Sequence, residues 1–213
     1  MHIPLVHPST ILVAGPTGSG KTVFVRKLIT ENMIYPFPTR IVIVFSEWQK
    51  EYEMLKWQLP SIEFLKGPVS PELYESFKPS EPNMLVLDDQ MTESSNTGEI
   101  EKYFVQGAHH RNLTVVFIVQ NLFSKNKALR TSSLNSNYFV IYKNPRDKQQ
   151  MSILSRQMYP NSWRALIAAL TDATEEPYSY MLLDMRPETP EEYRIRGNIF
   201  PSDPTVSTTI YII

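Results

Sequence analysis

The sequence has no cysteine among its 213 residues and only seven glycines. Without cysteine, the chain has no disulfide, no thiol nucleophile and no thiolate-bound zinc or iron–sulfur centre. No apolar run reaches the roughly 18 residues that a membrane-spanning helix needs. The N-terminus also lacks the basic segment and long apolar stretch of a secretory signal. We therefore expect an intracellular protein that is not secreted and has no membrane partner.

Charge is nearly balanced, with 21 Lys and Arg against 22 Asp and Glu, but it is unevenly distributed. Residues 107–160 carry eight basic side chains and one acidic side chain, a net charge of +7, which leaves −8 for the rest of the chain. Such a segment can bind phosphate or nucleic acid, although solvated helix and loop surfaces produce the same pattern. The basic residues are Arg111, Lys125, Lys127, Arg130, Lys143, Arg146, Lys148 and Arg156.

Short apolar segments alternate with amphipathic ones along most of the chain. This alternation is typical of an α/β fold with a mostly parallel sheet and helices on both of its faces. We expect one domain at residues 1–200 and a C-terminal extension at 201–213 that is either a strand or disordered. The expected strands are 11–14, 40–45, 62–65, 83–87, 113–119, 138–142 and 178–185, and the expected helices are 21–31, 46–58 (capped by Ser46), 71–77, 99–110, 146–158 and 162–170.

One segment, GPTGSGKT, matches the phosphate-binding (Walker A) pattern G-x-x-x-x-G-K-[ST]. It follows an expected strand and precedes an expected helix, as the pattern requires. Its glycines permit a tight turn whose backbone N–H groups face phosphate oxygens. Lys21 would supply a positive charge to the β- and γ-phosphates, and the Thr22 hydroxyl would ligate Mg²⁺, so we expect ATP and Mg²⁺ as ligands. The loop consists of Gly15, Pro16, Thr17, Gly18, Ser19, Gly20, Lys21 and Thr22.

Two other expected strands end in polar side chains suited to nucleotide hydrolysis. One strand leads into Asp88 and Asp89. We expect Asp88 to hold Mg²⁺ and Asp89 to orient or deprotonate the attacking water. A phosphoryl transferase aimed at another substrate would not need the second carboxylate. Gln120 closes the strand 113–119, where it would contact the γ-phosphate or cap a neighbouring loop.

The order of these features resembles the FtsK/HerA class of ATPases: phosphate loop, Asp-Asp strand, an arginine just before a strand, and glutamine at that strand's end. The segments QGAHHRNLTVVFIVQNLF, RTSSLNSNYFVIYKNPRDKQQ and PEEYRIRGNIFP resemble genome-packaging ATPases of polinton (Maverick) elements, adintoviruses and relatives of poxviruses and giant viruses. The resemblance spans residues 9–201 and is most specific between 108 and 146. Many members of the class have Glu after the metal-binding Asp, where this chain has Asp89.

This resemblance implies a three-layer P-loop NTPase of the RecA-like (ASCE) type, with the glutamine-bearing strand between the phosphate-loop strand and the Asp-Asp strand. It implies a homo-oligomeric ring with ATP sites at subunit boundaries, double-stranded DNA through its centre and a capsid or portal protein as partner. Arg111 corresponds by position to an arginine finger acting in the neighbouring site, with Arg130 and Arg146 as rivals. The ring would act in the host nucleus or in a cytoplasmic virus factory.

The leading interpretation is an ATP-hydrolysing motor that translocates double-stranded DNA and packages a viral or virus-like genome. Two alternatives stay open: a small-molecule phosphotransferase, which would turn over ATP only with its acceptor, and an ATP-gated assembly protein with little hydrolysis.

Several other features are expected to be structural. The aromatic residues Trp48, Tyr52, Trp57 and Phe64 have the spacing of core or subunit contacts. His109 and His110 are adjacent and lack further ligands, so they fit a last helical turn better than a metal site. The β-branched residues of 205–213 could form an edge strand, add a strand to a neighbouring subunit, or fray.

Overall fold

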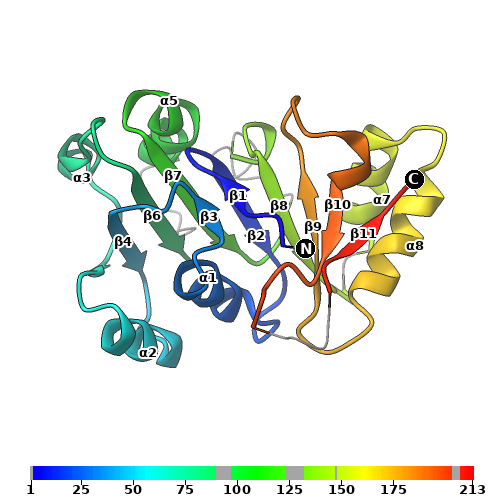
Figure 1. The fold of residues 1–213 in the computed structure, drawn as a ribbon, viewed down its shortest axis with the longest axis horizontal. Coiled ribbons are helices and arrows are strands. Elements are labelled where there is room, and N and C mark those ends of the chain that lie inside the picture. Colours follow the sequence, from blue (N-terminus) through cyan, green and yellow to red (C-terminus); the bar gives the residue numbers. More distant parts are fainter. Residues whose placement is uncertain (1, 90–96, 123–131, 147, 203–206) are drawn as a thin grey trace.

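The computed structural model describes residues 2–89, 97–122, 132–146, 148–202 and 207–213. Within these ranges the chain is built around a nine-stranded sheet in the order β11-β10-β9-β8-β2-β7-β6-β4-β5 (Figure 1). A separate pair of short parallel strands, β1 (Leu5–Val6) and β3 (Ile34–Tyr35), lies near the N-terminus. The strands of the large sheet are β2 (Thr10–Ala14), β4 (Arg40–Phe45), β5 (Glu63–Lys66), β6 (Asn83–Asp88), β7 (Leu113–Val119), β8 (Tyr138–Tyr142), β9 (Tyr180–Asp184), β10 (Ile195–Gly197) and β11 (Thr209–Tyr211).

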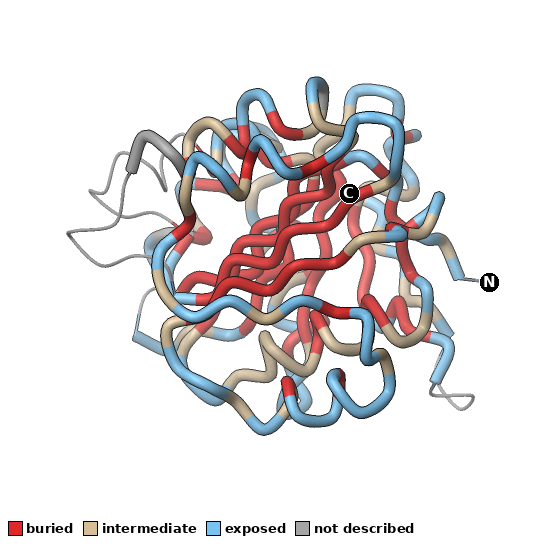
Figure 2. The backbone as a smooth tube through the Cα atoms, turned by 90° about the vertical axis from the view of Figure 1, so that its left-hand side faces the viewer, coloured by how far each residue is buried: buried red, intermediate tan, exposed pale blue. Residues whose placement is uncertain are grey.

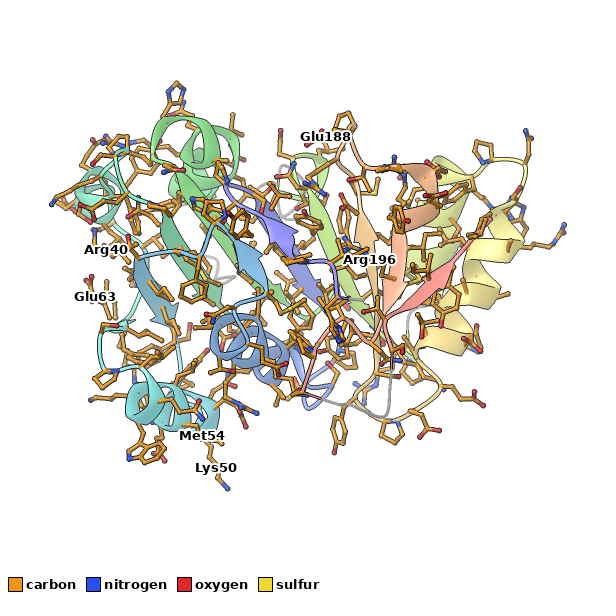
Figure 3. All side chains as sticks on the ribbon, viewed as in Figure 1. Arg40, Lys50, Met54, Glu63, Glu188 and Arg196 are labelled. Carbon is orange, nitrogen blue, oxygen red and sulfur yellow. The ribbon has the colours of Figure 1, made fainter. Side chains whose placement is uncertain are left out.

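Six adjacent strands, from β8 to β5, run parallel to one another, and β9, β10 and β11 extend the sheet in antiparallel pairs. Every residue of β2, β6, β7 and β8 is buried, which is the pattern of parallel strands covered on both faces. Strand β7 lies between β2 and β6. This confirms the strand arrangement that the resemblance implies. Strand β5 forms one edge of the sheet. There Glu63 pairs with Arg40 of the neighbouring strand β4, with 2.7 Å between Oε1 and Nε (Figure 3).

The helices form two layers, one on each face of the sheet. Alternate residues of each strand point to opposite faces, so Ile11 and Val13 of β2 pack with α1 and α2, whereas Leu12 and Ala14 pack with the helices of the other face. The buried strands between the two layers are visible in Figure 2. On one face lie α1 (Lys21–Thr30) and α2 (Lys50–Gln58), and on the other α3 (Pro71–Ser76), α4 (Thr97–Lys102), a π-helix (Tyr103–Gly107), α5 (Ala108–His110), α7 (Gln149–Met158) and α8 (Trp163–Ala173).

Some helix boundaries differ from the prediction. Helix α2 begins at Lys50, and the prediction that Ser46 caps it is wrong: the Ser46 hydroxyl donates to the Asp89 carbonyl oxygen at 2.8 Å. The predicted helix 99–110 contains a π-helical segment in which Tyr103 and Phe104 are buried. Helix α7 begins at Gln149, three residues later than predicted.

The C-terminal residues add the outermost strand of the sheet. Strand β11 pairs antiparallel with β10, and the Tyr211 hydroxyl donates to Asp172 of α8 at 2.7 Å. A short 3-10 helix, Glu191–Tyr193, precedes β10. In the parts of the chain that the structure describes, no helix combines the length and apolarity needed to cross a membrane.

Candidate nucleotide-binding site

Three polar strand ends meet at the carboxyl edge of the parallel sheet. Ala14, which precedes the phosphate loop, is in register with Val119, and Asp88 is in register with Ile118. The loop, the Asp-Asp pair and Gln120 therefore border one cavity of about 400 Å³. Its lining includes Lys21, Thr22, Asp88, Asp89 and Gln120.

The backbone of the phosphate loop requires its glycines. Gly18 and Gly20 have φ angles of 78° and 102°, a region that side chains rarely allow. A Cβ on Gly15 would lie 2.6 Å from the Cβ of Tyr142, so the strand next to the loop also excludes a side chain there. Helix α1 starts directly after its N-cap residue, Gly20, which makes no side-chain capping hydrogen bond. Its N-terminal N–H groups are thus available to an anion.

The Lys21 ammonium group is held against the loop itself. Its Nζ donates to the carbonyl oxygens of Gly15 at 2.7 Å and Pro16 at 2.9 Å. Burial lowers the pKa of Lys21, and the carboxylates of Asp88 and Asp89 counteract this effect. Phosphate oxygens carry more negative charge than carbonyl oxygens, so a bound polyphosphate would compete for the same ammonium hydrogens.

The two residues predicted to hold Mg²⁺ are joined by a third side chain. The Thr22 hydroxyl donates to Gln49 Oε1 at 2.7 Å, and Gln49 Nε2 donates to Asp88 Oδ2 at 2.6 Å. The Tyr52 hydroxyl donates to the same carboxylate oxygen. Burial raises the pKa of Asp88, and the hydrogen bond from Tyr52 opposes that rise. The Thr22 hydroxyl and the Asp88 carboxylate are hard oxygen donors, which fit a magnesium ion.

Asp89 has a backbone conformation that bears on its identity. Its φ of 53° lies in the left-handed region, which Asp and Asn adopt more readily than other residues with a side chain. Asp89 lines the cavity, and its carbonyl oxygen accepts the Ser46 hydrogen bond. This backbone conformation is a physical reason for Asp at position 89, where ATPases of the FtsK/HerA class often have Glu.

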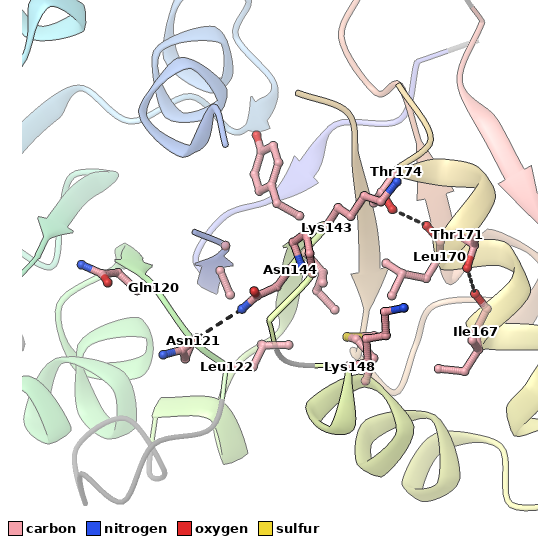
Figure 4. Close-up of a pocket in the computed structure, with 16 residues that line it drawn as sticks. Gln120, Asn121, Leu122, Lys143, Asn144, Lys148, Ile167, Leu170, Thr171 and Thr174 are labelled. Atoms are coloured by element: carbon pink, nitrogen blue, oxygen red, sulfur yellow. Dashed lines mark hydrogen bonds between the residues drawn. The ribbon is translucent and has the colours of Figure 1, made fainter. Parts of the chain in front are cut away.

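Gln120 stands between two cavities. Besides the cavity of the phosphate loop, it borders a second cavity of about 390 Å³ that is also lined by residues of α7 and α8 (Figure 4). Most of that second lining is apolar, for example Ile167 and Leu170, with Lys143 and Lys148 as its basic members. Gln120 is exposed, so its amide is free to contact a ligand at the loop.

The arginines predicted as candidate fingers lie in different places. Arg111 precedes β7 and therefore lies at the amino ends of the parallel strands, whereas the phosphate loop lies at their carboxyl ends. Arg111 forms an ion pair with Glu75, and its guanidinium lies 5.1 Å from the centre of the Tyr74 ring. Arg146 follows β8 at the same edge as the loop, where its backbone N–H donates to Asn144 at 3.1 Å. Arg130 lies outside the described residues.

A further cavity of about 360 Å³ flanks the phosphate loop on the side of residues 174–179. Tyr178 has a φ of 67° and is 73% exposed, and it borders both this cavity and the cavity of the loop. An exposed aromatic ring beside a phosphate site is suited to stack on a nucleobase.

The sequence predicts the loop and the strand ends, whereas Gln49 and Tyr178 border the cavity without belonging to either motif. The only signal for Gln49 was its position four residues after β4, the strand that pairs with β6. Tyr52 is fully buried, which confirms a core position, whereas Trp57 is 85% exposed and is not in the core of this chain. His110 ends α5 and is exposed. Among the described residues no cluster of three or more His, Cys, Asp or Glu could hold a metal ion.

Comparison with known proteins gives a consistent result. No family model matches the chain. It is 27% identical over 113 residues to packaging protein 1 of Snake adenovirus serotype 1. The aligned stretch covers 52% of this chain and 26% of that protein. The chain thus spans about a quarter of this relative's length.

The structure resembles the genome packaging NTPase B204 from Sulfolobus turreted icosahedral virus 2. With the sulfate complex the TM-score is 0.56 at 10% identity, covering 89% of this chain and 95% of that one. With the ATP-gammaS complex the TM-score is 0.55 at 12% identity, covering 89% and 96%. The chain therefore has the α/β fold of viral genome-packaging NTPases, which confirms the predicted fold class, and it is similar in sequence to part of an adenovirus packaging protein.

Proposed function

We propose that this chain is an ATPase that hydrolyses ATP to ADP and phosphate and, as a homo-oligomeric ring, moves double-stranded DNA into a viral or virus-like capsid. The observation that carries the proposal is the meeting of Lys21, Thr22, Asp88, Asp89 and Gln120 around one cavity. This set supplies a phosphate cradle, a metal site and a water-positioning group. The packaging role is supported by the names of the similar proteins.

Each residue of the cavity has a chemical role in this proposal. The loop amides and Lys21 bind the β- and γ-phosphates, and Thr22 and Asp88 hold Mg²⁺. When bound, the ion would neutralise charge on the phosphate oxygens. Asp89 orients or deprotonates the attacking water, which is worth about a hundredfold to ten-thousandfold in rate for a positioned base. Gln120 contacts the γ-phosphate or the water.

Arg111 is the proposed arginine finger of the neighbouring subunit's site. It lies at the amino end of β7, whereas the phosphate loop lies at the carboxyl edge of the sheet, so Arg111 is not part of its own chain's cavity. Its surroundings suit a residue that changes partners, because Glu75, which holds it, is 58% exposed. The basic segment 107–160 is the proposed source of DNA contacts. To dock onto a capsid in the infected cell, the ring would bind a separate capsid or portal protein.

The decisive experiment is steady-state ATPase measured where light scattering shows oligomers, with and without long duplex DNA. We expect DNA to stimulate hydrolysis, and Lys21→Ala and Arg111→Ala each to abolish it. Mixing the two variants should restore part of the activity, because a ring then contains some sites with an intact loop and an intact neighbouring arginine. Mg²⁺·ATP binding without hydrolysis in an assembled, DNA-bound ring would refute the motor and favour the assembly protein.

A further inference from the structure

Gln49 connects the two residues proposed to hold the metal ion. Both ends of its amide group are engaged: Oε1 accepts from the Thr22 hydroxyl at 2.7 Å, and Nε2 donates to Asp88 Oδ2 at 2.6 Å. Thr22 belongs to α1, Asp88 ends β6, and Gln49 belongs to the segment after β4. The bridge therefore joins three elements that are distant in the sequence.

The bridge is not explained by the needs of the adjacent helix. Gln49 is the N-cap residue of α2, yet its side chain makes no capping hydrogen bond. It lines the cavity of the phosphate loop instead. Helix α2 is attached to its neighbours by other contacts, namely the ion pair of Glu51 with Arg26 at 2.6 Å and the hydrogen bond from Tyr52 to Asp88. Loss of the Gln49 amide would leave these contacts in place.

The amide and a metal ion would compete for the same atoms. Asp88 Oδ2 accepts hydrogen bonds from Gln49 and from Tyr52, and the Gln49 amide fills the space between that oxygen and the Thr22 hydroxyl. Thr22 and Asp88 would hold a divalent ion in this same space, which the Gln49 amide occupies. A neutral amide attracts a carboxylate far less strongly than a divalent ion does, so the ion would displace it.

We propose that Gln49 is a positioning residue that closes the metal site and is displaced when Mg²⁺·nucleotide enters; this inference rests on the proposed nucleotide-binding function. Gln49 directly precedes α2, so its release changes the attachment of that helix to the site. The outer side of α2 carries Lys50 and Met54, which point away from the sheet (Figure 3). Metal binding is thereby communicated from the buried site to a surface helix.

Trp48 provides a local probe of this exchange. It neighbours Gln49 in sequence, and its ring lies 5.3 Å from the ring of Phe45 and 5.3 Å from that of Phe64. The chain has three tryptophans. Replacing Trp57 and Trp163 by Phe leaves Trp48 as the single tryptophan, so a change in tryptophan emission reports on the segment that carries Gln49.

The test compares binding of a non-hydrolysable ATP analogue in Mg²⁺ and in EDTA, by calorimetry and by Trp48 emission. The variants are Gln49→Ala and Gln49→Ser; Ser is a favourable N-cap and guards against loss of α2. Gln58→Ala, at the exposed end of α2, is the matched control. Because the variants have no bridge to break, we expect affinity in Mg²⁺ to rise about tenfold, the effect of one to two net hydrogen bonds, and affinity in EDTA to stay unchanged.

The outcomes separate this inference from the function on which it rests. The intact protein should show a Mg²⁺-dependent change in Trp48 emission that both Gln49 variants lose and Gln58→Ala keeps. Affinity in Mg²⁺ that falls or stays constant in the Gln49 variants, while the intact protein binds the analogue, would overturn the displacement of Gln49 alone. Failure of the intact protein to bind the analogue in either buffer would overturn the nucleotide-binding function itself.

Discussion

Replacing Asp184 by Asn should cost about 3–5 kcal/mol of unfolding free energy, because it removes the carboxylate that is paired with the buried guanidinium of Arg196. Arg196 and Asp184 are each 1% exposed and lie 3.1 Å apart between Nη2 and Oδ2. Among the described residues, the other hydrogen bond of the Arg196 side chain is from Nη1 to the Ile3 carbonyl oxygen, and its Nε has no hydrogen-bond partner there. For a chain of this size the loss corresponds to a fall in Tm of roughly 10 °C.

Urea denaturation followed by circular dichroism would measure this effect in a double-mutant cycle. Arg196→Met removes the buried charge and leaves Asp184 paired with Arg186 at 2.8 Å, so it should cost much less than Asp184→Asn. In the double variant the buried charge is gone, and the stability should recover by at least about 2 kcal/mol relative to Asp184→Asn. A loss below 1 kcal/mol for Asp184→Asn, or strict additivity of the two changes, would refute this account of the buried pair.

Four further predictions follow from single contacts. Asp89→Asn, which suits the left-handed backbone, should keep nucleotide affinity and stability while lowering kcat at least a hundredfold; a retained kcat would remove Asp89 from the chemistry. Glu75→Gln should release Arg111 and raise the ATPase rate of assembled rings about twofold to fivefold, with a stability change under about 1 kcal/mol, and an unchanged rate would argue against Arg111 as the finger. Tyr178→Ala should weaken ATP binding about five- to tenfold but leave tripolyphosphate binding unaltered, and equal losses for both ligands would contradict base stacking. Burial lowers the pKa of His7 below its usual 6.5, so the folded state favours the neutral ring: stability should fall as the pH drops below about 6.5, and His7→Gln should flatten that dependence in denaturant titrations at pH 5 to 8.

Much of the local structure was predictable because it depends on short-range patterns. The apolar runs of β4, β7 and β8 match the predicted bounds at 40–45, 113–119 and 138–142. The phosphate loop was recognisable because three glycines at fixed spacing are needed for its tight turn. Two of them, Gly18 and Gly20, have positive φ angles. Errors arose where tertiary contacts override local signals: Ser46 has the chemistry of a helix cap but donates instead to Asp89, 43 residues away.

The α/β alternation, the phosphate loop and the polar residues at the strand ends are predictable without the structure. They follow from side-chain periodicity and from motifs within eight or fewer consecutive residues. Which strand ends share a cavity depends on β7 lying between β2 and β6, an order that the resemblance implies and the folded chain confirms but that no local pattern predicts. The tertiary structure also brought Gln49 between Thr22 and Asp88, 27 and 39 residues away, and placed Arg111 at the far edge of the sheet. Such neighbours arise from strand order and register. Packing of the whole core sets both, so a short stretch of sequence does not predict them.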